Sequence, residues 1–398
     1  MFEGVRVLEV GTWIMVPAAA VLLADYGAEV VKVEHPRGGD PARGLVTGGA
    51  SPMQGPVNLM VEQANRGKRS IALDISTEAG RDCLYEMAAG ADVFMTSFLP
   101  APRQRLGIDV EDIRSVNPSI IYAKADAVGE RGPEGGKPGY DAAVFFGRAG
   151  ILNSFTRAGS PLVQPRPGFG DKTASLAIAF GIASALFRRE RTGVASVVDV
   201  SLLSSAMWVA SSDIVYSLAI GSDFSRRERP ATNPVATHYA TADGRWIMLS
   251  MLESQRWWPS LCRAIGHEEL IEDPRFADAA ARAENADACR AALSAAFVSA
   301  PLSEWRARLS SLAAPWEPVA DSHEAGQDPQ AAANGYVTDV EHPSGETLRV
   351  VRAPVTFDGR PGELGVAPEF GQHTEEVLLE LGRSWSAISG MKESGVIP

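Results

Sequence analysis

The sequence predicts an α/β protein whose N-terminal half forms a doubly wound, mostly parallel sheet. Short β-branched segments alternate with amphipathic helical segments between residues 5 and 125, which is typical of a sheet covered by helices on both faces. With 45% hydrophobic and 22% charged residues, the composition is that of a globular protein. The 398 residues are enough for about two or three domains.

The first elements show this alternation most clearly. Residues 5–11 (VRVLEVG) predict a buried strand, residues 17–26 a helix with proline in its first turn, and residues 28–34 (AEVVKVE) a second strand. We expect further strands at 70–74, 92–98 and 119–125, and helices at 77–89 and 110–116. Such a succession of strands and helices predicts parallel pairing.

Two loops rich in glycine and proline, 129–139 and 161–170, precede a long apolar helix predicted at 172–191. Gly193 follows its basic last turn and predicts its end. Residues 195–203 have strand character, and residues 204–220 predict a mostly buried helix.

The composition changes at 221–234, which is polar, basic and contains proline, so we expect a linker there. Beyond it, residues 238–240 and 246–250 flank Asp243-Gly244 and predict a β-hairpin. Helical, alanine-rich segments continue to about residue 313. This part is expected to form a second, smaller α+β domain. Residues 335–351 predict another hairpin and residues 374–381 a terminal helix.

The net charge excludes a broad nucleic-acid surface. Acidic residues outnumber basic ones by 49 to 37, a balance of −12, whereas binding along a phosphate backbone needs clustered Lys and Arg. The three cysteines lie far apart without CxxC spacing, so neither a disulfide framework nor a metal site is expected. The apolar run at 10–24 is short, interrupted by Pro17 and preceded by acidic residues, which argues against a signal peptide or membrane span. We expect a cytoplasmic protein.

Common nucleotide and hydrolase motifs are missing. The first strand leads through Gly11 into TWIMVP rather than into GxGxxG, and no GxxxxGK[ST], GxSxG or HExxH occurs. A nicotinamide enzyme or a P-loop enzyme is therefore disfavoured despite the α/β pattern.

Asp171 is the carboxylate whose position is unusual. It follows Pro167-Gly168-Phe169-Gly170 and immediately precedes the long apolar helix. On local sequence the simpler interpretation is a helix N-cap, whose replacement by Ala costs about 1 kcal/mol. The functional interpretation is that Gly170 lets a substrate approach the backbone while helix N–H groups stabilise an anion developing beside Asp171. The two interpretations are compatible.

Several motifs occur together in one order along the chain: VRVLEVG followed by PAAAVLLADYGAEVVKVEHPRGGDPAR, NRGKRS with IALD, Gly139-Tyr140-Asp141, Gly170-Asp171, and the segment GQHTE at 371–375. In these motifs the sequence resembles the class III CoA-transferase family, which includes formyl-CoA transferase, carnitine-CoA transferases and α-methylacyl-CoA racemase. The resemblance covers nearly the whole chain.

The resemblance implies a Rossmann-like large domain built from residues 1–220 and 331–398, with linkers at 221–234 and 314–330 around a small α+β domain at 235–313. It also implies an interlocked homodimer. The catalytic aspartate of the family falls on Asp171, beside Gly170, and no metal or permanently bound cofactor is expected. Coenzyme A enters as part of the acyl-CoA substrate.

By position in the family pattern, contacts to CoA are expected at His35, Leu73, Ser97, Phe98, Arg105, Lys137 and Tyr140. Basic side chains suit the phosphates of CoA, and apolar ones suit its adenine. Each residue also has a structural interpretation: Leu73 and Phe98 suit a strand-end core, His35 ends a strand, and Arg105 and Lys137 suit solvated surface.

The resemblance further implies CoA transfer from an acyl-CoA donor to a carboxylic acid through an aspartyl anhydride and an aspartyl-CoA thioester. Formyl-CoA transferase has His and Gln where this chain has Thr12 and Ile14, and its glycine-rich loop is replaced by Ser250-Met251-Leu252-Glu253, so a different acyl group is expected. Two alternatives stay open, an acyl-CoA racemase and a non-catalytic CoA-binding protein. Tyr140 stands where the racemases have a histidine base, and a phenol of pKa about 10 is a poor base at neutral pH.

Overall fold

The structure is a computed structural model that describes residues 1–44, 53–156, 159–224 and 233–398. The chain divides into two compact units, one of Met1–Arg226 with Ala332–Pro398 and the other of Arg227–Ala331. The division falls inside the segment predicted as the first linker, of which residues 225–232 lie outside the description.

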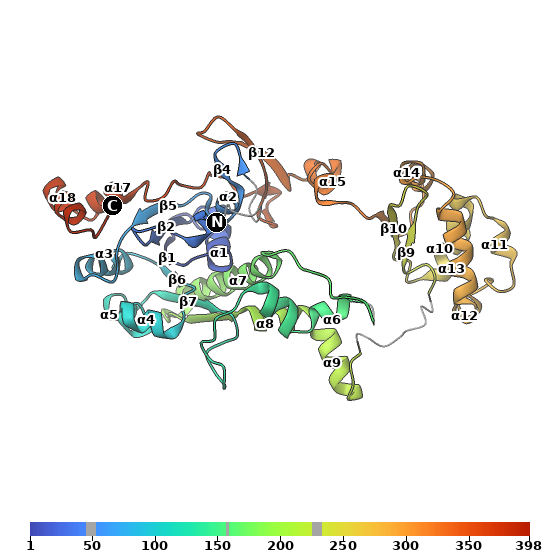
Figure 1. Cartoon of the computed structure of the whole chain (residues 1–398), viewed down its shortest axis with the longest axis horizontal. Helices are drawn as coiled ribbons and strands as arrows, with labels where there is room; N and C mark the ends of the chain where they lie inside the picture. Colours follow the sequence, from blue (N-terminus) through green and yellow to red (C-terminus); the bar gives the residue numbers. More distant parts are fainter. Residues whose placement is uncertain (45–52, 157–158, 225–232) are drawn as a thin grey trace. The chain divides into compact units, whose positions relative to one another are not determined.

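A six-stranded parallel sheet forms the centre of the first unit, with the strand order β5-β2-β1-β6-β7-β8 (Figure 1). The strands are β1 Arg6–Val10, β2 Glu29–Glu34, β5 Arg69–Ala72, β6 Val93–Thr96, β7 Ile121–Asp126 and β8 Val197–Ser201. All of their pairings are parallel. The predicted parallel α/β sheet is confirmed. The order reverses between β1 and β6, and ligands of such sheets bind at the carboxyl ends of the strands where the order reverses.

One face of the sheet is covered by α1 (Met15–Ala24) and α7 (Phe169–Thr192), which pack against each other. Their buried side chains, such as Ala19 and Ile178, join those of Val7, Val93 and Ile121 in one apolar core. Both helices follow loops at the carboxyl edge, so both begin there. The start of α7 is consequently held close to the loop after β1.

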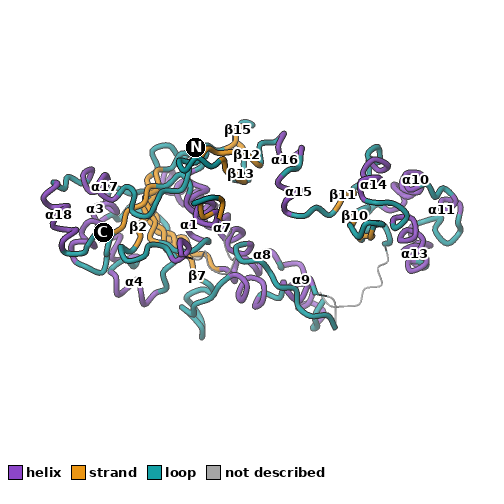
Figure 2. Tube along the Cα trace, turned by 45° about the horizontal axis from the view of Figure 1, so that its top comes forward, coloured by secondary structure: helices purple, strands orange, loops and turns teal. Residues whose placement is uncertain are grey.

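The other face is covered by α3 (Glu78–Ala89), α5 (Val110–Val116) and the C-terminal helices α17 (Thr374–Glu380) and α18 (Trp385–Glu393). Figures 1 and 2 both show the C-terminal helices beside α3, far from it in sequence. The tail is fixed to the edge strand: His373 N–H donates to the Ser70 carbonyl at 2.9 Å, and Asp74 N–H donates to the Val396 carbonyl at 2.8 Å. Sequence analysis missed α18.

Shorter elements complete the first unit. The helical ones are η1 (Pro41–Gly44), α2 (Leu59–Asn65), α4 (Pro100–Leu106), the π-helix at Ala142–Arg148, α6 (Ile151–Phe155), α8 (Leu202–Val209), α9 (Ser211–Ile220) and α16 (Pro329–Ala333), which ends in this unit. Three small hairpins pair β3 (Met53–Gln54) with β4 (Val57–Asn58), β12 (Val337–Glu341) with β13 (Thr347–Val351), and β14 (Thr356–Phe357) with β15 (Arg360–Pro361). The hairpin predicted at 335–351 is confirmed.

The second unit contains a three-stranded antiparallel sheet of β9 (His238–Ala240), β10 (Trp246–Leu249) and β11 (Trp316–Pro318). Helices α10 (Ser254–Ile265), α11 (Glu269–Glu272), α12 (Ala279–Glu284), α13 (Ala286–Phe297), α14 (Leu302–Leu309) and α15 (Ser322–Gly326) accompany it. Buried Trp258 and Trp305 belong to its own apolar core. The predicted hairpin around Asp243-Gly244 is confirmed.

Two expectations for particular segments are wrong. Residues 204–220 form two helices, α8 and α9, instead of one, and the segment is mostly exposed because α9 has no buried residue. Residues 314–330 include β11, which pairs with β10, so this segment is not entirely a linker. Neither feature has a sequence signal, because a three-residue strand is too short to show a period and apolar composition alone does not reveal which surface covers a helix.

Among the residues that the structure describes, no single helix has the length and apolarity needed to cross a membrane. Helices α8 and α9 meet those requirements of length and composition only as a pair, and the pair is bent by 72°.

Candidate active site at the carboxyl edge of the parallel sheet

The loops after β1 and β6 meet where the strand order reverses. Ser97 directly follows β6, and its Oγ accepts a hydrogen bond from Thr12 N–H in the loop after β1 at 3.0 Å. This position, outside the carboxyl ends of neighbouring parallel strands, is where sheets of this class bind their ligands. We therefore take this edge as the candidate active site.

Below the loop after β1 lies a buried network of charged side chains. Lys32 Nζ contacts Glu9 Oε1 at 2.8 Å and Asp40 Oδ2 at 2.9 Å, and Lys68 Nζ contacts Glu9 Oε2 at 2.6 Å. All four side chains are buried. Burial of charges is tolerated where they are paired and hydrogen-bonded, as they are here. The network supports the loop, because Lys32 Nζ also donates to the Gly11 carbonyl at 2.8 Å.

A second buried carboxylate caps α7. Asp141 Oδ2 accepts hydrogen bonds from Gly168 N–H at 2.7 Å and from Gly170 N–H at 3.2 Å. Gly168 is the N-cap residue and has no side chain to cap with, while Asp171 lies in the first turn. The interpretation of Asp171 as the N-cap is therefore wrong, because Asp141 from a preceding segment satisfies these N–H groups.

Gly170 is required by packing inside the protein. A Cβ atom at this position would lie 2.6 Å from Phe145 Cγ and 2.8 Å from Asp141 Cβ. Its N–H is also engaged with Asp141. The role of Gly170 in oxyanion binding stays a prediction, and it would require this N–H to exchange partners.

Asp171 itself is partly buried, and none of the described residues makes a hydrogen bond or ion pair with its carboxylate. Burial, together with the nearby charge of Asp141, raises the pKa of Asp171 to about 7, although the charge of Lys172 acts in the opposite direction. Loss of hydration and a like charge both disfavour the ionised form. A poorly solvated carboxylate without partners is chemically available to an incoming electrophile.

The residues expected to contact CoA come mainly from this edge. His35, Leu73 and Ser97 each directly follow a strand, namely β2, β5 and β6, and Phe98 follows Ser97. His35 is exposed, with Nε2 4.0 Å from Asp74 Oδ2, whereas Leu73 is buried in the core of the α3 face, which favours a structural role. Phe98 is partly buried.

The remaining three lie on α4 and in the loop after β7. Arg105 is exposed on α4, and Lys137 is exposed and forms an ion pair with Glu134. Tyr140 is 63% exposed and its ring meets that of Trp13 edge-on, with centroids 5.7 Å apart. Sequence analysis did not assign Trp13 a function and gave Asp141 none beyond the resemblance. The buried network could have been predicted from Glu9 and Lys32, because a charged residue within an apolar strand indicates a buried charge that needs a partner.

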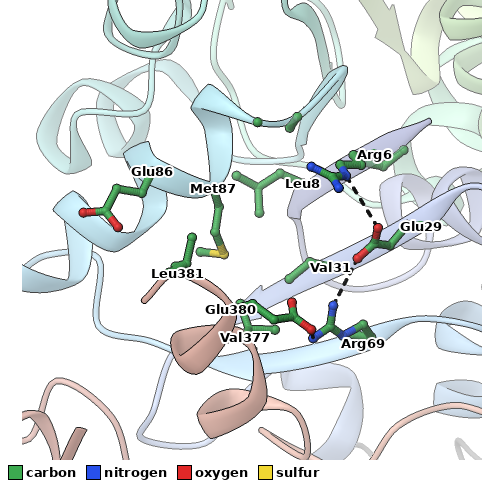
Figure 3. Close-up of a pocket in the computed structure, with 13 residues that line it drawn as sticks. Arg6, Leu8, Glu29, Val31, Arg69, Glu86, Met87, Val377, Glu380 and Leu381 are labelled. Carbon is green, nitrogen blue, oxygen red and sulfur yellow. Dashed lines mark hydrogen bonds and ion pairs between the residues drawn. The ribbon is translucent and has the colours of Figure 1, made fainter. Parts of the chain in front are cut away.

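A separate pocket of about 420 Å³ lies at the amino end of β1, where α3 and α17 approach the sheet (Figure 3). Its lining includes Leu8, Val31, Met87, Val377 and Leu381. Figure 3 shows Arg6 and Arg69 pointing to Glu29, and Arg69 also pairs with Glu380 at 2.8 Å. These charged groups are already paired with one another. The pocket is at the opposite edge of the sheet from Asp171, so it is not the candidate active site.

The fold is that of an α/β protein with a candidate active site at the carboxyl edge of its parallel sheet, where the Asp171 carboxylate has no partner among the described residues. The chain belongs to CoA-transferase family III, whose model matches residues 2–374. It is therefore an enzyme that transfers CoA between an acyl-CoA and a carboxylic acid.

Curated relatives support this assignment over the whole length. The chain is 31% identical to (R)-2-hydroxy-4-methylpentanoate CoA-transferase of Clostridioides difficile, covering 100% of this chain and 99% of that protein. It is 30% identical to cinnamoyl-CoA:phenyllactate CoA-transferase of Clostridium sporogenes, covering 99% and 96%. It is 29% identical to human succinyl-CoA:glutarate CoA-transferase, covering 99% and 89%.

Solved structures agree with the fold. A CAIB/BAIF family protein from Brucella suis matches with a TM-score of 0.83 and 28% identity, covering 96% of this chain and 99% of that one. Rv3272 from Mycobacterium tuberculosis matches with a TM-score of 0.79 and 29% identity, covering 94% and 97%.

Proposed function

We propose that this CoA-transferase works by covalent catalysis with the Asp171 carboxylate as nucleophile. The observation that carries the proposal is that two nearby carboxylates have different partners. Asp141 caps α7, and Asp171 has no partner among the described residues. An aspartate needed only for structure would be expected to occupy the cap. A carboxylate left without partners at a ligand-binding edge suits a nucleophile.

The steps balance without ATP or an oxidant. An Asp171 oxygen attacks the thioester carbonyl of the donor, the C–S bond breaks, and an aspartyl acyl anhydride and CoA thiolate form. The thiolate attacks the aspartyl carbonyl of the anhydride, which releases the donor acid as a carboxylate and leaves an aspartyl-CoA thioester. The acceptor carboxylate then attacks this thioester and the sequence runs in reverse, producing the new acyl-CoA and free Asp171.

CoA would bind along the loops that follow the strands. Ser97 and Tyr140 stand close to the loop after β1, and exposed His35, Arg105 and Lys137 offer positive or hydrogen-bonding groups for phosphates. Phe98 offers apolar surface. Leu73 is the weakest member of the expected set, because its side chain is enclosed by the core.

We also propose a homodimer. The helices α7, α8 and α9 carry many exposed large apolar side chains: Leu176, Phe180, Phe187, Met207, Trp208, Val215 and Leu218. Monomers rarely expose so many large apolar side chains on successive helices, and a second copy of the chain would remove them from water.

Adduct mapping tests the proposed nucleophile. Wild-type protein incubated with acyl-CoA alone should form an adduct at Asp171 that hydroxylamine converts to a hydroxamate, detected by mass spectrometry of peptides. Asp171→Asn should remain folded and bind CoA, yet lose transfer by on the order of 10³-fold or more, since a neutral amide is a far weaker nucleophile. Normal transfer by the Asn variant, or an adduct on another residue, would refute the proposal.

The two rival functions give different results. A racemase would incorporate solvent deuterium rapidly at the α-carbon of a 2-methylacyl-CoA, and Tyr140→Phe would abolish that exchange. For the transferase we expect little incorporation and partial retention of transfer in Tyr140→Phe. A non-catalytic binder would form no adduct with any acyl-CoA.

A further inference from the structure

Trp13 has a backbone conformation that is unusual for its size. Among the described residues, the non-glycine residues with positive φ are Trp13, at 68°, and Asp358, at 53°. Aspartate visits this region readily, whereas a bulky aromatic residue there is a genuine outlier, at a cost of about 1–3 kcal/mol. Such strain persists only where the surroundings fix the backbone.

Three consecutive residues of the loop are held by side chains from other elements. Gly11 C=O accepts from Lys32 Nζ at 2.8 Å, Thr12 N–H donates to Ser97 Oγ at 3.0 Å, and Trp13 N–H donates to Asp40 Oδ1 at 3.0 Å. Asp40 and Lys32 belong to the buried charge network, which Glu9 and Lys68 complete. These contacts hold the backbone of the loop in place, and with it the position from which the Trp13 side chain extends.

This loop lies beside the start of α7. The Trp13 ring meets the Tyr140 ring edge-on, and the next residue, Asp141, binds the N–H groups of Gly168 and Gly170, which immediately precede Asp171. Ile14, the residue after Trp13, also shows that the loop is close to the start of α7, because its Cδ1 atom is 3.5 Å from the position that a Cβ on Gly168 would take. The Trp13–Tyr140 ring pair and the Ile14 side chain thus lie next to the residues that immediately precede Asp171.

We propose that Trp13 is a specificity-determining residue whose ring, together with Tyr140, forms the wall of an acyl subsite selecting branched or aromatic hydrocarbon chains over chains with a second carboxylate. The inference rests on the proposed function, because it takes Asp171 as the point of acyl transfer. A rigid aromatic wall stabilises an apolar chain by excluding water, while it offers no cation to a distal carboxylate. The buried network acts as a positioning device for that wall.

The test compares four donors, acetyl-CoA, isovaleryl-CoA, phenylacetyl-CoA and succinyl-CoA, by kcat/KM and by the rate of adduct formation at Asp171. Wild type should prefer isovaleryl-CoA and phenylacetyl-CoA over succinyl-CoA by about tenfold or more. Trp13→Gly removes the ring and accepts positive φ without strain, so it should fold. We expect it to lose about 10- to 100-fold with the two hydrocarbon donors and no more than about threefold with acetyl-CoA.

Two further variants control the comparison. Trp13→Phe keeps a ring and should retain the wild-type order of donors, and Trp385→Ala removes an exposed tryptophan of α18 and should change nothing. Two results would refute the acyl wall and leave Asp171 as the proposed nucleophile. One is adduct formation at Asp171 with the same order of preference among donors in wild type and in Trp13→Gly. The other is a wild-type protein that prefers succinyl-CoA. An adduct mapped away from Asp171 would instead overturn the proposed nucleophile.

Discussion

At the scale of single residues, the informative feature is a pair of carboxylates with different surroundings. Asp141 is buried and accepts two backbone hydrogen bonds, while Asp171 is partly exposed and has no such partner among the described residues. Asp141 thus has a structural role as a helix cap, and the different surroundings of Asp171 are the basis for the catalytic role proposed for it.

The raised pKa of Asp171 predicts the pH dependence of the first chemical step. In the proposed mechanism the ionised form of Asp171 is the nucleophile, so the rate of adduct formation should rise with pH around a midpoint near the pKa of about 7. Asp141→Asn retains a hydrogen-bond acceptor and removes the like charge, so the midpoint should move to lower pH. Quenched-reaction mass spectrometry across pH 5 to 9 measures both midpoints. An identical midpoint in the two proteins would contradict the assignment.

The Asp171 carboxyl should also make the free energy of unfolding depend on pH. Stability should fall as pH rises, whereas the rate of adduct formation should rise. The pKa of Asp171 is raised from 3.8 to about 7 on folding, so the folded state holds a proton that the unfolded state has lost between these values. The contribution of Asp171 to the free energy of unfolding is therefore most favourable below about pH 4 and is lost as pH rises through about 7. Asp171→Asn should be more stable than wild type at pH 8 by about 1 to 3 kcal/mol, and equal at pH 4. Urea unfolding at the two pH values checks this.

At the scale of elements, the start of α7 depends on a close approach between two segments. The π-helix segment lies so near Gly170 that any side chain there would collide with Phe145 and Asp141. The glycine therefore belongs to the packing that keeps the cap in place. This explains a Gly-Asp pair without reference to a substrate.

Gly170→Ala should destabilise the fold by about 1 to 3 kcal/mol, because the added methyl group forces the segments apart. Gly390→Ala is the matched control: it lies in helix α18 with nothing within 4 Å of the added Cβ, and should be neutral or stabilising by up to about 1 kcal/mol. Thermal unfolding of both variants is the measurement. Equal changes in stability for the two variants would show that the close approach between the π-helix segment and Gly170 is not needed for the stability of the fold.

The buried charge network makes a second prediction for the elements around β1. Lys68→Met would leave the buried Glu9 with one cation instead of two, and should cost about 3 to 5 kcal/mol. Lys392→Met removes an ion pair with Glu375 on the surface and should cost less than about 1 kcal/mol. Denaturant titration compares the two, and a small loss for Lys68→Met would argue that the network adds little.

At the scale of the whole molecule, the exposed apolar surface of α7, α8 and α9 is the main unexplained feature of the single chain. Trp208 is 81% exposed and Leu218 is 77% exposed, which is unfavourable for large apolar side chains in water. A homodimer would account for them. It would also explain why a segment predicted to be buried is exposed in one chain.

For the proposed homodimer, light scattering should give twice the mass of one chain. The interlocked arrangement that the family resemblance implies further predicts no folded monomer on dilution, because interlocked chains separate only on unfolding. Phe180→Asp places a charge on the exposed stripe of α7 and should yield aggregated or unfolded protein rather than a stable monomer. Phe155→Asp changes an equally exposed ring outside these three helices and should leave the mass unchanged. A folded, soluble monomer at micromolar concentration would contradict the dimer.

The sequence by itself determined the parallel sheet. Local period and composition identify strands such as 28–34 and 119–125, because strands buried on both faces must be apolar and helices between them must be amphipathic. It also identified the family and the position of Asp171, since both depend on motifs that are contiguous in the chain. Single short elements, such as β11, have no such period.

The tertiary structure decided which side chains meet. Asp141 caps α7 from 27 residues before Gly168, Asp40 fixes Trp13 from 27 residues away, and Ser97 binds the loop after β1 across 85 residues. Hydrogen bonds and ion pairs depend on distances in space, and local sequence carries no record of them. For this reason the sequence allowed Asp171 to be a helix cap, a nucleophile or both, and the fold excluded the cap by giving it to Asp141.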